Sequence, residues 1–590
     1  MVIIQSETGV AIAISIAILF VVPAVSTLSA WFTHGDWYLM DEGTILYAAY
    51  RSSLGELPHT EIPYFYTGGL EILLGIVFRI FGSTFAVARW TLGVNMALTA
   101  ALTYLISRKL SVGKTIAACF AVIATTLAYG MNFHIYPAWY GSTCLLLALL
   151  FMWNGLQTGE RRWLLVAGVC LGVASSMKQT SGIYGLFAFV LSVLLLSGGL
   201  FPLSVSKQPT KKTNVTLAVL AATPIATLIF FVILLRSQLT LLNVIMFLGT
   251  PLIVIAFTLR TVMVMSRSHG GAERFVSETK MVLLPVFAGF ALGFLPVALI
   301  YAVQGNLGQF VGDSFINIQQ AFAHRYSVFK FVEDEATSNP FVFVRWLTLF
   351  VIPIAAALIG FLYSIRNGLK CGELRLLLLL SVLIAFSYFT LYPIAIRMYV
   401  LFLLPLVTIS AAYFAGIVLS RLFGSTMLRV STVISIFVLV AMIYLGARSF
   451  SGDLDVITTT KVGLLNQHAG NALVSQETID YLRPVLGYIE HRPTEESFVG
   501  FDVFQKLIAF VTRKKIQTDY LQRHYFNEIT PDDFAALKHL AEDRKIDIVV
   551  IGRRYLSGSQ PEQSLFDYLN SRYDLALDNQ THLVYQRIPK

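Results

Sequence analysis

Residues 64–82 read YFYTGGLEILLGIVFRIFG, and whether this stretch crosses a membrane decides the topology of the whole chain. Helical spacing places Glu71, Gly75 and Arg79 on one face of a helix, opposite an apolar face. Such an amphipathic helix tends to lie in the plane of a membrane surface. The sequence therefore predicts a surface helix that does not cross, in which Glu71 and Arg79 are structural residues, as is Arg89 at the start of the next apolar run.

The chain around this stretch is too apolar for a water-soluble protein. It has 590 residues, of which 56% are hydrophobic and 13% are charged, and its mean hydropathy is +0.70. Soluble domains carry about 25% charged residues, and one soluble core stops growing at about 250–300 residues. The bilayer must therefore solvate most of the chain, which excludes ordinary cytosolic enzymes and nucleic-acid-binding modules. The net charge of +9 is interpreted as an orientation signal and not as a binding site for nucleic acid.

Apolar runs long enough to span a bilayer recur along the chain. A spanning helix needs about 20 mainly apolar residues, and about thirteen stretches meet this length. They are residues 10–30, 84–106, 115–131, 138–157, 161–177, 181–199, 214–235, 239–259, 281–302, 341–363, 375–392, 397–419 and 428–446. The first lacks the basic region and cleavage site of a signal peptide, so we expect it to be retained. The four cysteines lie in or beside apolar runs and are interpreted as packing residues.

The positions of the basic residues orient these spans. If residues 64–82 stay at the surface, the Lys and Arg residues between spans, from Arg108 and Lys109 to Arg421 and Arg429, fall on one side. This is the cytoplasmic side by the positive-inside rule. We therefore expect a multi-pass protein of the plasma (inner) membrane with a cytoplasmic N-terminus. The long loops 31–83 and 304–340 are then external.

The C-terminal segment, residues 448–590, differs in character from the rest. It is rich in charge, and it alternates amphipathic helix patterns at 477–490 and 532–544 with short strand-like runs at 497–501, 546–552 and 582–586. Strands alternating with helices predict a small α/β domain. We therefore expect two domains, a transmembrane domain at residues 1–447 and an extracytoplasmic α/β domain at residues 448–590.

Acidic residues follow the first predicted span. Asp36, Asp41 and Glu42 lie in the first external loop, where the chain leaves the hydrocarbon. A carboxylate in this partly desolvated setting can still reach a water-soluble substrate, which suits a general base. Two structural interpretations stay open: Asp41 as the N-cap of a helix from Gly43 onward, and Asp36 as a solvated loop residue.

Cations are predicted at the same side of the membrane. Lys178 and Arg397 stand at the outer ends of spans, and His324 and Arg325 lie in the second long external loop. Such positions suit the phosphate of a lipid-linked substrate, although an interfacial lysine also commonly extends to lipid headgroups. The first loop carries no His-rich or Asp-x-Asp metal signature, so we expect no metal and no cofactor, and nothing supports a divalent cation.

These elements together resemble the GT-C integral-membrane glycosyltransferases, in particular the branch that uses polyprenyl-phosphate-linked sugars. That branch includes aminoarabinose transferases and protein O-mannosyltransferases. The resemblance rests on the order of Asp41-Glu42-Gly43, the Leu54-Gly55-Glu56-Leu57-Pro58 segment, the surface helix ending in Phe81-Gly82, Lys178-Gln179-Thr180, and Arg397 before a late span. The chain departs from the aminoarabinose transferases at Tyr66-Thr67-Gly68, where those relatives carry a lysine.

The resemblance implies a GT-C-like fold and a glycosyltransferase whose active site faces outward. The donor is then a polyprenyl-phosphate-linked sugar, and the acceptor is a lipid, a glycan or a protein. Asp41, with Asp36 and Glu42 as neighbours, activates the acceptor. Lys178, Arg397, His324 and Arg325 supply the cations that hold the lipid phosphate.

Two other functions fit part of the same pattern. A lipid-linked sugar flippase or transporter also needs many spans, but such proteins commonly show internal repeats, and none is visible here. A glycan polymerase or ligase also uses lipid-linked donors, and only the identity of the donor separates it from the first hypothesis.

Overall fold

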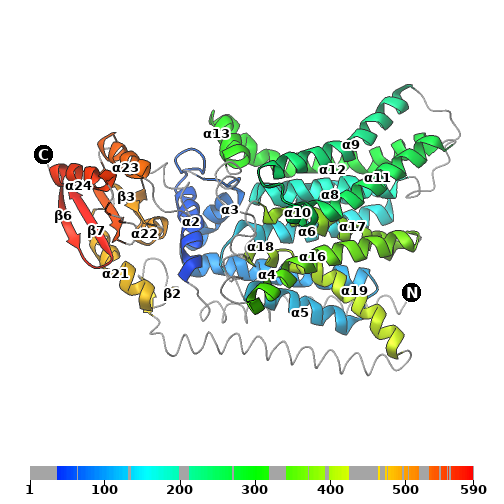
Figure 1. The fold of residues 1–590 in the computed structure, drawn as a ribbon, viewed down its shortest axis with the longest axis horizontal. Helices are drawn as coiled ribbons and strands as arrows, with labels where there is room; N and C mark the ends of the chain where they lie inside the picture. Colours follow the sequence, from blue (N-terminus) through cyan, green and yellow to red (C-terminus); the bar gives the residue numbers. More distant parts are fainter. Residues whose placement is uncertain are drawn as a thin grey trace. The chain divides into compact units, whose positions relative to one another are not determined.

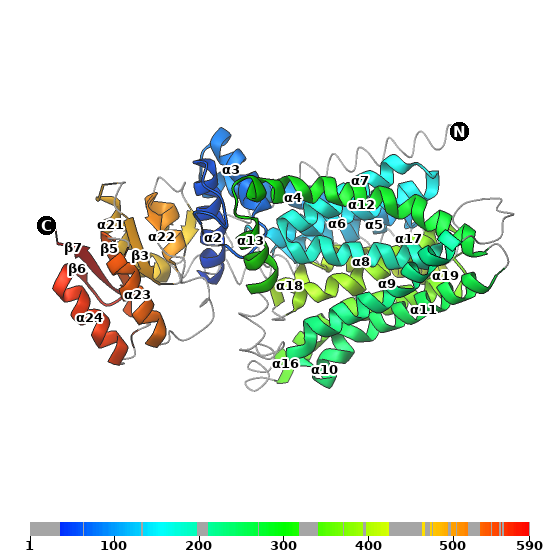
Figure 2. The same cartoon turned by 90° about the horizontal axis from the view of Figure 1, so that it is seen from above.

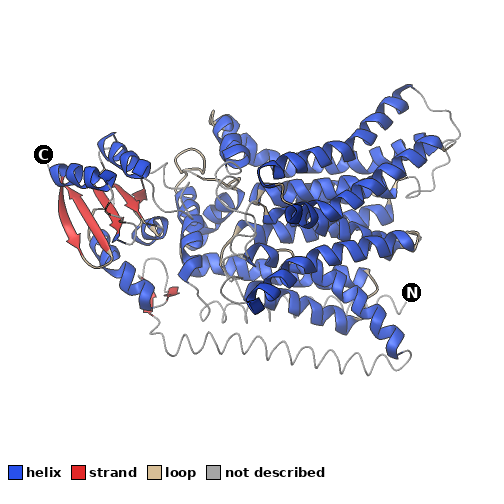
Figure 3. Ribbon diagram, viewed as in Figure 1, coloured by secondary structure: helices blue, strands red, loops and turns tan. Residues whose placement is uncertain are grey.

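The computed structural model describes the chain from residue 36 to residue 588 with gaps. The described residues are 36–62, 64–130, 134–197, 211–268, 271–317, 340–369, 371–392, 397–423, 463–465, 472–474, 476–493, 497–502, 504–516, 531–543, 546–553, 556, 558 and 560–588. In this part of the chain helices predominate, and all strands belong to the C-terminal segment (Figure 3).

The described residues form two compact units. One, here called the mixed unit, takes its residues from Val25–Gly93, Phe133–Tyr136 and Ala447–Lys590. The other, the helical unit, takes its described residues from Val94–Asn132 and Pro137–Gly446. This division differs from a cut after residue 447, because the first loop groups with the C-terminal segment instead of with the spans.

The helical unit is a bundle of long helices (Figure 1). Its helices are α4 (Phe85–Lys109, whose first turns belong to the mixed unit), α5 (Lys114–Gly130), α6 (Pro137–Thr158), α7 (Arg161–Met177), α8 (Gln179–Leu196), α9 (Lys211–Leu235), α10 (Leu241–Asn243), α11 (Gly249–Arg267), α12 (Gly271–Val303), α13 (Leu307–Val311), α16 (Pro340–Arg366), α17 (Gly372–Ser387), α18 (Arg397–Leu401) and α19 (Leu404–Phe423). Short 3-10 or π segments connect them at Arg236–Gln238, Val244–Leu248, Gly312–Asn317 and Tyr388–Leu391.

The helices overlap the predicted spans. Among the described residues, eight helices are long and apolar enough to cross a membrane, and two shorter apolar helices accompany them. Every span predicted between residues 84 and 419 falls on one or more of these helices or on α7, whereas those at 10–30 and 428–446 lie outside the described residues. Large apolar side chains such as Ile229 on α9 and Leu292 on α12 are exposed, as expected for contact with lipid. The chain is a multi-pass membrane protein.

Helices α7 and α12 touch through their backbones (Figure 2). A Cβ atom added at Gly168 or Gly172 of α7 would lie 2.1 Å or 2.3 Å from a carbonyl oxygen of α12. A Cβ added at Gly289 or Gly293 of α12 would lie 2.0 Å or 2.3 Å from a carbonyl oxygen of α7. Small residues four apart on both helices allow this approach, which is a common way for helices to associate in a bilayer.

In the mixed unit, α2 (Asp36–Ser53) and α3 (Gly69–Phe81) pack against each other. A Cβ added at Gly75 would lie 2.8 Å from the Cβ of Ser52, so only glycine fits this contact. With 13 residues, α3 is about 20 Å long, too short for a hydrocarbon core of about 30 Å. Its buried face carries Glu71, and its exposed face carries Ile80 and Phe81. A polar buried face and an apolar exposed face are expected for a helix whose outer face contacts lipid.

The C-terminal segment folds around a five-stranded mixed sheet. Its elements are α21 (Gln476–Glu490), β3 (Ser497–Phe501), α22 (Gln505–Thr512), β4 (Lys515–Ile516), α23 (Pro531–Asp543), β5 (Ile548–Gly552), α24 (Gln560–Arg572), β6 (Tyr573–Asp578) and β7 (His582–Arg587). The strand order is β4-β3-β5-β7-β6, with β4, β3 and β5 parallel and β7 and β6 antiparallel to their neighbours. A separate pair, β1 (Gly463–Leu465) and β2 (Ala472–Val474), is antiparallel.

Helix α22 and strand β4 pack on α2. The backbone N–H of Ile516 donates a hydrogen bond of 3.0 Å to the Tyr47 hydroxyl. A Cβ added at Gly43 would lie 2.7 Å from the Cβ of Leu507, so α2 and α22 approach closely at this point. These contacts explain why the first loop and the C-terminal segment form one unit.

Candidate functional site

Asp41 lies within a helix and not before one. Helix α2 begins at Asp36, so the interpretation of Asp41 as an N-cap is wrong. The Asp41 side chain is partly exposed, yet the surrounding protein desolvates it enough to raise its pKa to about 7. Within the described residues, no group donates a hydrogen bond to its carboxyl. Asp41 therefore has the properties of a general base poised near neutral pH, and Asp36 stands at the first position of the same helix.

The neighbouring Glu42 is buried and bound by Arg89. The Arg89 guanidinium donates to both carboxylate oxygens, with Nε 3.2 Å from Oε1 and a terminal nitrogen 2.9 Å from Oε2. Two-point pairing of this kind fixes both side chains. The geometry therefore favours a positioning role for Glu42 beside Asp41, and it gives Arg89 the structural role that its sequence position predicts.

A buried polar cluster follows α2 in the same unit. The Tyr64 hydroxyl donates to the Glu71 carboxyl, the Tyr66 and Tyr136 hydroxyls are hydrogen-bonded, and a ring nitrogen of His59 lies 2.6 Å from the Tyr66 carbonyl oxygen. Burial raises the pKa of Glu71 to about 7. Glu71 is therefore turned inward and is protonated over much of the acidic range.

Arg79 does not pair with Glu71. Its Nε donates to the carbonyl oxygen of Ser53 at the end of α2, at 3.2 Å. Each residue has its own partner: Tyr64 for Glu71 and the α2 backbone for Arg79. The periodicity of the sequence indicates the shared face, and only the fold indicates the partners.

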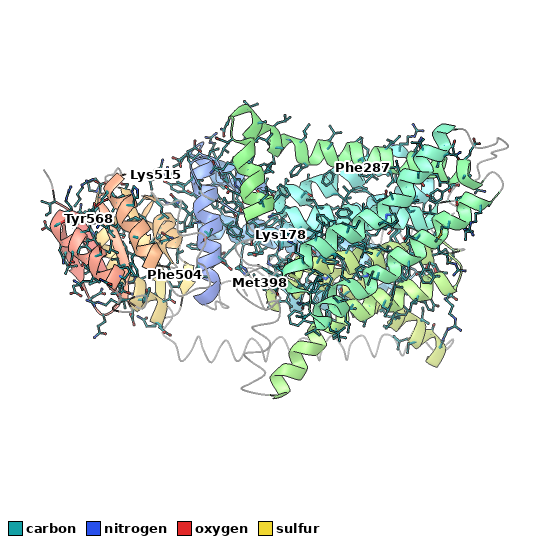
Figure 4. The ribbon with its side chains drawn as sticks, turned by 45° about the horizontal axis from the view of Figure 1, so that its top comes forward. Lys178, Phe287, Met398, Phe504, Lys515 and Tyr568 are labelled. Atoms are coloured by element: carbon teal, nitrogen blue, oxygen red, sulfur yellow. The ribbon has the colours of Figure 1, made fainter. Side chains whose placement is uncertain are left out.

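In the helical unit, Lys178 occupies a break between two helices. Its backbone is extended (φ −143°, ψ 114°) and separates α7 from α8. The side chain is buried, and its Nζ lies 4.5 Å from the ring centroid of Tyr399 and 5.7 Å from that of Phe402. Lys178 and the α18 residue Met398 are labelled in Figure 4. The lysine is thus held inside the unit instead of extending to lipid headgroups.

The segment that contacts Lys178 is the one that begins with Arg397. Arg397 is the first residue of α18, Tyr399 follows two residues later, and Phe402 comes directly after the helix. The fold therefore brings the backbone positions of two predicted phosphate-binding residues into one neighbourhood. His324 and Arg325, the other two, lie outside the described residues.

Aromatic and amide side chains extend the neighbourhood of Lys178. The Trp139 ring stacks on Tyr129 at 4.1 Å and meets Phe402 edge-on at 4.4 Å between ring centroids. Within the described residues, the buried indole N–H of Trp139 has no hydrogen-bond partner. The Gln179 amide donates to the carbonyl oxygen of Ser314 at 2.8 Å. The sequence shows only that this region is rich in aromatic residues, because a contact such as that of Trp139 with Phe402, 263 residues apart, leaves no local pattern.

In the described part of the chain, no three His, Cys, Asp or Glu side chains are close enough together to bind a metal ion.

Comparisons with known proteins give a partial family match and a fold. Residues 70–227 match the family model described as dolichyl-phosphate-mannose-protein mannosyltransferase. No curated protein matches the chain in a sequence search.

Two solved structures resemble the chain at low sequence identity. ArnT from Cupriavidus metallidurans bound to undecaprenyl phosphate is 12% identical, with a TM-score of 0.50, over 99% of this chain and 98% of that one. The apo oligosaccharyltransferase from Archaeoglobus fulgidus is also 12% identical, with a TM-score of 0.50, over 92% of this chain and 69% of that one. These likenesses extend over nearly the whole chain and show its fold.

Proposed function

We propose that this chain is a GT-C-type glycosyltransferase that moves a sugar from a polyprenyl-phosphate-linked donor to a lipid, glycan or protein acceptor. The partial family match and the fold support this proposal. The observation that carries the proposal is that Lys178 is buried in a bundle of apolar helices, where its amine lies near the rings of Tyr399 and Phe402. A buried cation among membrane helices normally marks a substrate path. The phosphate of a lipid-linked donor, which ArnT binds as undecaprenyl phosphate, is a substrate of the right charge.

In the proposed reaction, an acceptor hydroxyl or amine attacks the anomeric carbon of the donor. The bond from that carbon to the phosphate oxygen breaks, the bond to the acceptor forms, and polyprenyl phosphate leaves with the bonding electron pair. Asp41 accepts the proton of the acceptor, for which its pKa of about 7 is suitable. Glu42 and Asp36 lie on the same helix, and Glu42 fixes the orientation of α2 through Arg89.

The leaving phosphate is a stable anion, so no strong general acid is required. Lys178, Arg397, His324 and Arg325 are proposed to hold its charge, as preorganised donors do in other transferases. We propose no metal or other cofactor. The proposed location is the inner membrane, with a cytoplasmic N-terminus and with the active site and C-terminal segment on the extracytoplasmic face, since the positive-inside rule favours this orientation.

The proposed function is tested by measuring the transfer of radiolabelled sugar from the lipid-linked donor to an acceptor. Purified protein is incubated with membrane extract and a panel of radiolabelled sugar-phosphopolyprenols, beginning with the mannosyl compound, and the lipid, glycan and protein fractions are counted. Protein-dependent label in one fraction supports the proposal and names the acceptor class. Movement of the donor across vesicle membranes with no covalent transfer would contradict it and identify a flippase.

A further inference from the structure

Helix α22 turns one face toward the helices of the first loop. Phe510 of α22 meets Tyr50 edge-on at 6.4 Å and stacks on Phe78 at 6.3 Å between ring centroids, and the Arg513 guanidinium lies 4.6 Å from the Tyr50 ring centroid. Residues four and seven positions apart share a face of a helix. Lys506, four positions before Phe510, therefore lies on the face directed at α2.

The two helices run in the same direction along this contact. Leu507 abuts Gly43, and Phe510, further along α22, contacts Tyr50, further along α2. Following α22 back to Lys506 therefore leads toward the beginning of α2. Figure 4 labels Phe504 and Lys515, which flank α22 in the chain.

Lys506 is a buried amine without a counter-charge in the part of the chain that the structure describes. The residue is 6% exposed, and its Nζ has no hydrogen-bond partner there. Burial lowers its pKa to about 7. Two acids of these segments have other partners: Glu42 pairs with Arg89, and Asp502 accepts from the Tyr481 hydroxyl and the backbone N–H of Phe504.

The position of Lys506 within α22 adds to its need for an anion. It is the second residue of an eight-residue helix, where the helix dipole is positive and backbone N–H groups lack helical partners. A second positive charge in this place is unfavourable, and the carboxylate of Asp502 at this end of the helix bonds Phe504 and Tyr481 and not Lys506.

We propose that Lys506 binds an anionic phosphate group of a substrate of the glycosyl transfer. This inference rests on the proposed function and deepens it, because it assigns part of the substrate site to the C-terminal segment. The phosphate comes from one of two sources, the lipid-linked donor or a phosphorylated acceptor. Removing Lys506 is expected to weaken phosphate binding and at the same time to relieve the folded protein of an unpaired buried charge.

The test uses the purified full-length chain and direct binding measurements. The probes are undecaprenyl phosphate, undecaprenol as its phosphate-free counterpart, and glucose 1-phosphate as a soluble phosphate ester. The variants are Lys506→Met, Lys506→Arg and, as a matched control in the same segment, Lys538→Met on α23. Thermal unfolding of each variant is recorded in the same detergent.

Lys506→Met should weaken binding of one phosphate probe by about tenfold or more, the loss expected for one charge-assisted hydrogen bond. Its unfolding temperature should stay level or rise, whereas Lys506→Arg retains binding and Lys538→Met behaves as wild type. The weakened probe identifies the source of the phosphate, and undecaprenol should bind all variants alike.

The proposal is overturned if wild type binds neither phosphate probe, if Lys506→Met binds both as wild type does, or if its binding falls only in step with a lowered unfolding temperature. Binding does not require turnover, so the two ideas fail separately. Phosphate binding that depends on Lys506, in a protein that transfers no sugar, would contradict the proposed function alone.

Discussion

Arg89 clamps Glu42 with two hydrogen bonds, of 3.2 Å and 2.9 Å, across 47 residues of sequence. The Glu42 carboxylate is fully buried and the Arg89 side chain nearly so. The pair fixes the start of α4 against the turn of α2 that carries Asp41. The orientation of the proposed base therefore depends on an ion pair that does not itself take part in the chemistry.

Breaking this pair should destabilise the protein strongly. Glu42→Leu leaves the Arg89 charge buried and unpaired, which typically costs about 3–5 kcal/mol. Thermal unfolding of the purified protein in detergent measures the loss. The double variant Glu42→Leu/Arg89→Leu should recover most of the stability, because no lone charge remains. A single variant as stable as wild type would show that the pair contributes little.

Asp41→Asn should reduce turnover by at least about 100-fold, as loss of a general base does. Asparagine keeps the size of the side chain, so expression and binding of undecaprenyl phosphate should be unchanged. The label-transfer assay measures the rate, and Asp574→Asn on the exposed strand β6 is the control. Near-normal turnover in Asp41→Asn would exclude Asp41 as the base.

The pH dependence of turnover should report the Asp41 carboxyl. Burial raises its pKa to about 7, and only the deprotonated form accepts a proton. Activity at saturating substrate should therefore rise about tenfold per pH unit below 7 and level off above it. Initial rates between pH 5 and pH 9 give the profile. The residual activity of Asp41→Asn should lack this inflection, and an inflection retained in that variant would assign it to another group.

Replacing Lys178 should affect the donor. Lys178→Met removes the charge and keeps the length of a side chain that packs on Tyr399 and Phe402. Affinity for undecaprenyl phosphate should fall roughly 10- to 100-fold, the range for one hydrogen bond to a charged group. A titration of the purified protein measures it, with Lys109→Met at the exposed end of α4 as the control. Equal affinity in both variants would remove Lys178 from the donor site.

Glu71 should make stability depend on pH. Its pKa is about 7 in the folded state and near 4.5 in the unfolded chain, so the folded state holds a proton that the unfolded chain has lost between these values. Stability must then fall as pH rises from about 5 to 7, by roughly 3 kcal/mol for a shift of this size. Glu71→Gln stays neutral and should flatten that fall.

Unfolding temperatures at pH 5 and pH 8 compare the two proteins. The Asp41 carboxyl contributes a fall of the same sign, so the difference between wild type and Glu71→Gln is the informative quantity. Parallel pH curves would mean that the Glu71 carboxyl is already ionised in the folded protein.

Much of the membrane architecture follows from the sequence because hydropathy acts locally. Apolar length alone locates helices such as α8 and α12, since each run must satisfy its own backbone hydrogen bonds in lipid. The amphipathic pattern of residues 64–82 likewise predicts α3, whose polar side turns inward in the structure. The strand-like runs 497–501 and 582–586 correspond to β3 and β7.

The partners of the site residues depend on long-range packing and leave no such local trace. The sequence around Glu42 does not predict that Arg89 is its partner, and the sequence around Lys178 does not predict its contact with Phe402. The start of α2 at Asp36 was also not predictable, because Gly43 reads as a helix-weakening residue until Leu507 is packed against it. That contact likewise explains why the first loop joins the C-terminal segment.

The meeting of α7 and α12 through bare backbone has a consequence for how the protein tolerates change. At Gly172 the backbone of α7 contacts α12 with no side chain between them. Substitutions there therefore cannot change the distance between the two helices in small steps. Lys178 lies six residues after Gly172, directly after the last turn of α7. The position of Lys178 along the bundle is therefore fixed by the contact between α7 and α12. Substitutions on the lipid-facing surfaces of these helices should leave that position unchanged.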